Sequence, residues 1–70
     1  MVKLKEYDSV ALLENLPENN LKKGQVGVVV MVYDNKNVEV EFLDSFGHTL
    51  SVCPLQTNKL LRLQYEVTTV

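Results

Sequence analysis

Short runs of apolar residues alternate with polar, turn-forming segments along this chain. Apolar runs of this length, separated by turn segments roughly every ten residues, are typical of β-strands. The pattern predicts strands over residues 9–13, 28–33, 38–42, 49–53 and 60–63. The chain is therefore expected to form an all-β domain.

Three of these strands indicate which side chains face a core. Residues 38–42 and 49–53 alternate between apolar and polar positions, and a strand with this period buries one face only. The expected inward residues are Val38, Val40, Phe42, Leu50 and Val52, and the expected outward residues are Glu39 and Glu41. Residues 28–33 show no alternation, so both faces of that strand are expected to be at least partly covered.

The connection after the first strand, residues 14–20, is long. Pro17 cannot donate to a strand ladder, and one helical turn fits after it. Leu16 and Leu21 are expected to hold this connection against the core. Two glycines provide backbone freedom for the next turn and for a close approach of strands, namely Gly24 and Gly27.

The later connections are shorter. Residues 34–37 and 44–48 are expected to form tight hairpin turns, the second with Gly47 in a left-handed conformation. Pro54 is expected to end the fourth strand, because proline lacks the N–H that a ladder needs. Residues 55–59 suit a single 3-10 turn before the last strand.

This order of strands and turns is similar to that of SH3-like barrels. We therefore expect a small five-stranded SH3-like barrel over residues 1–63, with one 3-10 turn before the last strand. Residues 64–70 have high β propensity and little charge. They are expected to form either a pairing strand or a frayed terminus.

Composition and charge narrow the function classes. The chain has 70 residues, one cysteine and a hydrophobic content of 46%, which is typical of one folded domain in a reducing compartment. Seven basic and nine acidic residues give a net charge of −2, whereas a general nucleic-acid binder usually has a basic excess. The absence of a signal-length or membrane-spanning apolar run predicts a cytoplasmic protein that does not enter a membrane.

Few residues suit catalysis or metal binding. Cys53 is the only cysteine and His48 the only histidine, so they form the one candidate pair of nucleophile and base of these types. They would lie roughly 15 Å apart on an extended chain. One histidine and one cysteine do not make a tetrahedral zinc site without added carboxylates. A barrel this small is filled by its own side chains. We therefore expect no enzymatic activity, metal, cofactor or small-molecule substrate.

Three segments, in this order, resemble a known family. They are "LPE" at residues 16–18, "LKKGQVG" at 21–27 and "VEVEF" at 38–42, with Gly47, Thr49 and Leu60 fitting the later part. The family is bacterial and is catalogued as domain of unknown function 4926, and the similarity covers residues 7–63. The resemblance implies an SH3-like barrel with no assigned enzymatic activity. It also implies a small companion of a neighbouring gene product, either antitoxin-like or an accessory subunit.

Surplus apolar surface favours a protein partner, either another protein or a second copy of this chain. Within residues 28–33, one alternating set faces outward and forms an apolar stripe unless strong bending buries both faces. The expected contact residues are Met31, Tyr33, Phe46, Tyr65 and Val67. Alternatively, the side chain of Phe46 folds back as a lid over the end of the barrel. The acidic residues expected to steer a basic partner are Glu14, Glu18, Glu39 and Glu41.

The alternative function is weak nucleic-acid binding. Residues 22–28 are loosely similar to the KOW element of ribosomal and transcription-factor SH3-like domains. Lys22, Lys23 and Lys36, together with Tyr33, form the candidate surface for phosphates and stacked bases. Acidic residues close to these lysines in the sequence would weaken the positive field.

Overall fold

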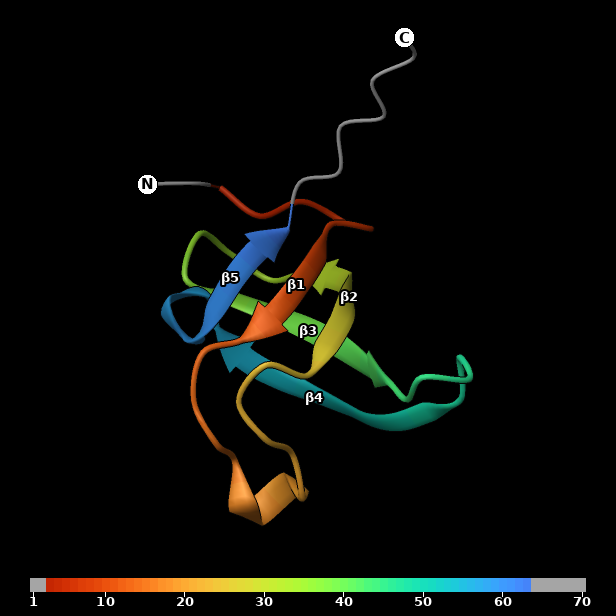
Figure 1. Ribbon diagram of the computed structural model, residues 1–70. Coiled ribbons are helices and arrows are strands. Elements are labelled where there is room, and N and C mark those ends of the chain that lie inside the picture. Colours follow the sequence, from red (N-terminus) through yellow and green to blue (C-terminus); the bar gives the residue numbers. More distant parts are fainter. Residues whose placement is uncertain (1–2, 64–70) are drawn as a thin grey trace, which may run out of the picture.

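The computed structural model describes residues 3–63, which form one antiparallel sheet of five strands (Figure 1). The strands are β1 (Ser9–Leu12), β2 (Val26–Val32), β3 (Asn37–Leu43), β4 (Thr49–Gln56) and β5 (Leu60–Leu63). Two 3-10 turns connect strands, η1 (Pro17–Asn19) before β2 and η2 (Thr57–Lys59) before β5. The all-β prediction, with a 3-10 turn before the last strand, is confirmed.

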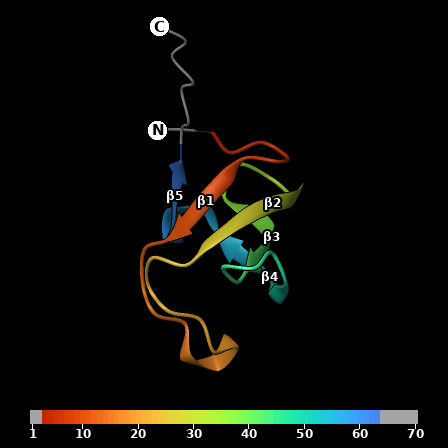
Figure 2. The ribbon, with the colours of Figure 1, turned by 45° about the vertical axis from the view of Figure 1, so that its right-hand side comes forward.

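The strand order in the sheet is β4-β3-β2-β1-β5, so β4 and β5 are its two edges. The sheet bends strongly. As a result, β1 and β5 lie in front of β3 and β4 in Figure 1, and they remain in front after the rotation of Figure 2. Every strand contributes to the core that the bend encloses. Closure of this sheet into an SH3-like barrel stays a prediction.

The core consists of apolar side chains from all five strands, from the segment before β1 and from the β1–β2 connection. Its buried members are Leu4, Val10, Leu12, Leu21, Val29, Val38, Val40, Phe42, Cys53 and Leu60. Leu16 packs against this cluster and forms an isolated β-bridge with Leu21. The expected anchoring of the long first connection by these two leucines is therefore confirmed.

Gly27 lies where β2 and β3 approach closely. It pairs with Val10 of β1 on one side and with Phe42 of β3 on the other. A methyl group at Gly27 would lie 2.7 Å from the carbonyl oxygen of Glu41 and 2.8 Å from Cγ1 of Val40. The absence of a side chain at this position therefore lets β3 pack tightly against the middle of the bend, as the sequence predicts.

An aspartate holds each of the two hairpin turns. The Oδ1 atom of Asp34 accepts hydrogen bonds from the backbone N–H groups of Lys36 at 2.8 Å and Asn37 at 2.9 Å. In the second turn, Oδ1 of Asp44 accepts from the N–H groups of Phe46 at 2.8 Å and His48 at 2.9 Å. The turn closes through a glycine with a positive φ of 84°, which is Gly47 as predicted.

A β-bulge in β2 explains why its sequence shows no alternation. Val29 pairs with Val40, but the next pair is Met31 with Glu39, so Val30 is an extra residue on β2. Val29 is buried, and without the bulge Met31 would share its inward face. The bulge instead places Met31 opposite an outward glutamate. Neither alternating set of residues 28–33 therefore stays on one face, because the inward and outward positions change places at Val30.

The inward residues predicted for β4 are wrong. Cys53 pairs with Val40 and is buried, whereas Leu50 and Val52 are 48% and 51% exposed. A one-residue shift in phase turns every side chain of a strand to the other face, and the pairing with β3 sets that phase. Leu50 is also an extra residue, since Phe42 pairs with Ser51 and Leu43 with Thr49.

The predicted end of β4 is also wrong. Pro54 lies inside the strand, which continues to Gln56, and it pairs with Glu39. Proline is tolerated because β4 is an edge strand, where a missing N–H on the open side breaks no ladder bond. The 3-10 turn is correspondingly shorter than expected and begins at Thr57.

Candidate functional site

The outward side chains of β2, β3 and β4 form two cross-strand rows. One row is Val52, Glu41 and Val28, and the other is Pro54, Glu39 and Met31. Directly opposite residues of antiparallel strands project from the same face at about 5 Å. The rows therefore make one surface, with two carboxylates between apolar side chains. We call these six residues the acidic–apolar face.

Large apolar side chains are exposed on and beside this face. Leu50 and Val52 lie two residues apart on β4, and Met31 on β2 is 46% exposed. Phe46 is 84% exposed at the tip of the β3–β4 hairpin, and its ring lies 6.4 Å from that of His48. The alternative in which Phe46 folds back as a lid is therefore wrong.

Neutral hydroxyl-bearing residues adjoin the two carboxylates of the face. The hydroxyl of Thr49 donates a hydrogen bond to Oε2 of Glu41. Tyr33 lies near Glu39, and its pKa is raised, first by desolvation and then by the charge of Glu39. The Glu41 carboxylate thus has one donor on the face, and its other oxygen accepts no hydrogen bond from a side chain of the described residues.

Neither carboxylate has a cationic partner. All seven Lys and Arg side chains of the chain lie within residues 3–63. The ion pairs within this part are Lys59 with Glu14, Arg62 with Asp8, and His48 with Asp44. Glu39 and Glu41 are half-buried beside apolar neighbours, and no Lys or Arg lies within salt-bridge distance of either carboxylate.

The structure separates the four predicted acidic steering residues. Glu39 and Glu41 share the acidic–apolar face, but Glu14 and Glu18 lie in the β1–β2 connection. The carboxylate of Glu14 is paired with Nζ of Lys59 at 2.6 Å. Of the predicted contact residues, Met31 and Tyr33 adjoin Glu39, whereas Tyr65 and Val67 lie outside the described residues.

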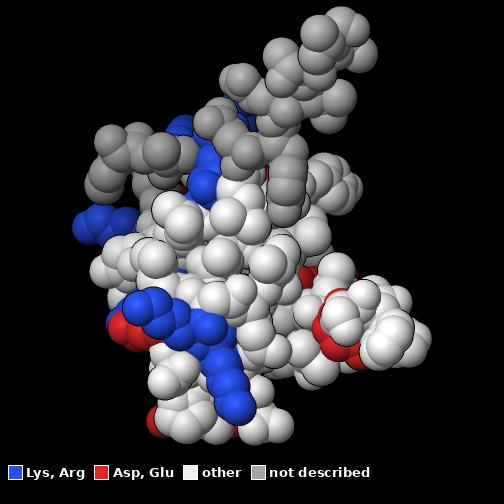
Figure 3. Space-filling view, viewed as in Figure 1, with Lys and Arg blue, Asp and Glu red and all other residues white. Residues whose placement is uncertain are grey.

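The predicted lysine surface is not brought together. Lys22 and Lys23 precede β2 and Lys36 follows it, and a strand of this length spans roughly 20 Å. In Figure 3 the blue side chains lie in separate groups, and the middle of the face is white. Three exposed lysines at opposite ends of a strand do not make one phosphate-binding patch.

Sequence reasoning missed a further exposed apolar row. Leu61 of β5 pairs with Ala11, which pairs with Val26 of β2, and Leu61 and Val26 are exposed. This row belongs to the half of the sheet that faces the viewer in Figures 1 and 3. It carries no carboxylate, so it differs in chemistry from the acidic–apolar face.

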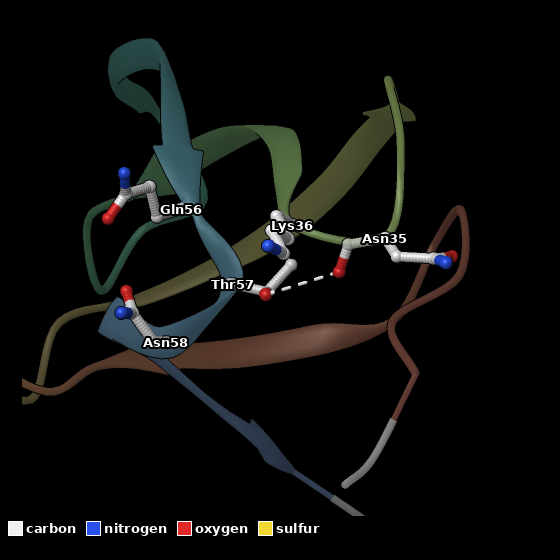
Figure 4. Close-up of a pocket in the computed structure, with 5 residues that line it drawn as sticks. All are labelled: Asn35, Lys36, Gln56, Thr57 and Asn58. Atoms are coloured by element: carbon white, nitrogen blue, oxygen red, sulfur yellow. Dashed lines mark hydrogen bonds between the residues drawn. The ribbon is translucent and has the colours of Figure 1, made fainter.

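A pocket of about 340 Å³ lies between the β2–β3 turn and η2 (Figure 4). Its lining residues are Asn35, Lys36, Gln56, Thr57 and Asn58. The hydroxyl of Thr57 donates to the carbonyl oxygen of Asn35 at 3.4 Å. The side chain of Asn35 points away from those of Gln56 and Asn58. Binding sites for small molecules use convergent polar groups, and these side chains do not converge.

The only Cys and His differ in surroundings. Cys53 is buried in the core, and desolvation there raises the pKa of its thiol. His48 is exposed in the hairpin, where its Nδ1 lies 3.4 Å from Oδ2 of Asp44. A buried thiol with a raised pKa is protonated at neutral pH and is a poor nucleophile. Within residues 3–63 there is also no cluster of three or more potential metal-ligating side chains.

Comparison with protein families finds a match over residues 6–62 to the family described as domain of unknown function (DUF4926). The chain belongs to this family. The match to DUF4926 includes all of β1 to β4 and most of β5, and with them the whole acidic–apolar face. Comparisons with curated proteins and with solved structures give no match. No helix within the described part of this DUF4926 chain is long and apolar enough to cross a membrane.

Proposed function

We propose that this DUF4926 domain is a non-catalytic protein-binding module and that the acidic–apolar face is its contact surface. The observation that carries the proposal is the exposure of Val52 and Met31 directly beside two glutamates that have no cationic partner among the described residues. Covering apolar surface stabilises a complex by about 25 cal/mol per Å². Uncompensated charge at the same place favours a partner of complementary charge.

The biological role that fits this proposal is that of a small companion. A domain of 70 residues with a filled core offers surface and little enclosed volume. We therefore place its partner among the products of neighbouring genes, for which the domain acts as an accessory subunit or an antitoxin-like protein in the bacterial cytoplasm. Nucleic-acid binding is not favoured, because the candidate lysines lie at the two ends of β2.

Site-specific photo-cross-linking tests the proposal. A benzoylphenylalanine replaces Val52 in the chain expressed from its native locus, and a matched control variant carries it at Leu61 on the opposite half of the sheet. Both positions are about half exposed, so the probe is equally accessible at each. We expect a defined adduct with the product of an adjacent gene from position 52 and not from position 61. The proposal fails if the two positions give the same adducts or if neither gives one.

A further inference from the structure

The open edge of β4 presents a defined set of backbone groups. The N–H of Thr57 donates to the carbonyl of Lys36 at 2.9 Å, which makes these two residues a hydrogen-bonded pair. Such pairs alternate with non-hydrogen-bonded pairs along an antiparallel ladder. The backbone groups of Gln56, Pro54 and Val52 therefore point away from β3, toward the open edge. Val52 and Gln56 offer both N–H and C=O there, and Pro54 offers C=O only.

The same residues of β4 carry the side chains of the acidic–apolar face. Val52 projects beside Glu41, and Pro54 projects beside Glu39. The two glutamates are two residues apart on β3, so their side chains are separated by roughly 7 Å. An extended chain has the same spacing between side chains at positions i and i+2. A strand added to this edge would hence place alternate side chains in register with the two carboxylates.

We infer that the acidic–apolar face and the open edge of β4 bind an extended segment of a partner protein with Lys or Arg at alternate positions. This inference rests on the proposed function and specifies the partner's chemistry. The basic side chains project over Val52 and Pro54 and reach Glu41 and Glu39, across about 10 Å between the added strand and β3. The aliphatic stem of Lys or Arg covers the apolar surface, and its charged end meets a carboxylate.

A second copy of the chain fits this surface less well. Antiparallel pairing of two β4 edges would bring together two strands that each lack the N–H of Pro54, so two backbone hydrogen bonds would be lost instead of one. Proline on an edge strand discourages such edge-to-edge association. Each copy would also bring its own uncompensated glutamates to the interface. A basic partner removes that repulsion. The charge of the face therefore favours a different protein over a second copy of the chain.

Fluorescence anisotropy at low ionic strength provides the test. The probe is a fluorescein-labelled synthetic peptide of alternating valine and lysine, and the comparison peptide has the same composition with its lysines grouped at one end. The double variant Glu39→Gln/Glu41→Gln removes the two charges of the face. Glutamine retains an oxygen that accepts the hydrogen bond from the Thr49 hydroxyl, so this contact of the sheet is kept. The matched control is Glu14→Gln/Glu18→Gln, which changes the net charge equally at another place.

The alternating peptide should bind the unmodified domain, and the face variant should weaken this binding by roughly tenfold while the control changes it little. Backbone amide resonances of Val52 and Gln56 should shift on binding. Equal binding of the grouped peptide, equal loss in the control variant, or no binding at low salt would each overturn the inference. So would sedimentation of the free domain as a dimer that Val52→Lys dissociates.

The photo-cross-linking and the peptide-binding experiments distinguish failure of the proposed function from failure of the further inference. Photo-cross-linking at Val52 reports any protein that covers the face, whatever its sequence. A defined adduct at Val52 with no binding of the alternating peptide would leave the proposed function standing and reject the basic extended segment alone. Without an adduct, binding of the peptide would support the chemistry of the face and reject the neighbouring gene product as its partner.

Discussion

Cys53 of β4 pairs with Val40 of β3, and both side chains are buried. Because neighbouring residues of a strand face opposite sides, this pairing turns Val52 to the outer surface beside Glu41. The exposed apolar residue and the half-buried carboxylate of the proposed binding surface thus depend on one cross-strand contact. Their position can be tested without knowledge of the partner.

Truncation of Val40 and of Val52 should have very different effects on stability. Val40→Ala leaves a cavity in the core and should lower the free energy of unfolding by about 2–3 kcal/mol. Val52→Ala removes an exposed side chain and should change it by about 0.5 kcal/mol or less. Urea denaturation followed by circular dichroism measures both values. Similar losses in the two variants would contradict the phase assigned to β4.

Gly27→Ala should destabilise the sheet by about 1–3 kcal/mol. The added methyl group would lie 2.7 Å from the carbonyl oxygen of Glu41, and a backbone atom cannot move away as a flexible side chain can. The neighbouring Val26→Ala is the control, since Val26 is exposed. Thermal unfolding of the two variants measures the difference, and an unchanged midpoint for Gly27→Ala would show that β3 does not approach as closely as described.

Asp44→Ala should loosen the β3–β4 hairpin and cost about 1 kcal/mol, because the backbone N–H groups of Phe46 and His48 lose their acceptor. Asp44→Asn keeps an oxygen at that position and should retain most of the stability. Ser45→Ala, in the same turn, is the neutral control. Amide hydrogen exchange of Phe46 and His48 should speed up in the alanine variant only. Equal exchange in all variants would exclude a role for the Asp44 carboxylate.

Stability should fall at alkaline pH in part because of Cys53. Burial raises the pKa of its thiol, so the folded state keeps the proton to higher pH than the unfolded chain does. This contribution is fully present below the ordinary thiol pKa of about 8.5, and it is lost as the pH rises toward the folded value. Denaturation from pH 7 to 10 should show a smaller loss for Cys53→Ala than for the unmodified domain. Parallel curves would contradict a buried thiol.

Features that depend on neighbouring residues could be predicted from the sequence. The turn at Asp44 and the one at Asp34 form through hydrogen bonds to groups at most four residues away. Gly47 takes its positive φ within a single turn. The clean alternation of β3 predicts its inward and outward faces correctly, because the extra residues of both its ladders lie on the neighbouring strands and β3 itself stays regular against the core.

The candidate site could be predicted only in part. The alternation predicts an outward Glu39, while Met31 and Tyr33 are expected contact residues, and the structure places both beside Glu39. Val52 was assigned to the core, because an apolar residue in an alternating strand fits either face until its partner strand is known. The one local signal was Pro54, whose missing N–H suits an open edge and whose side chain shares the face of Val52.

By itself, the sequence of this protein determined the all-β class, the turns and the 3-10 segment before β5. These follow from backbone preferences and side-chain chemistry over a few residues. Only the tertiary structure decided the phase of β4, the bulge that turns Met31 outward and the meeting of Glu39 and Glu41 with exposed apolar residues. Register between strands distant in sequence is set by the fit of whole faces against the core, and a shift of one residue exchanges buried and exposed positions.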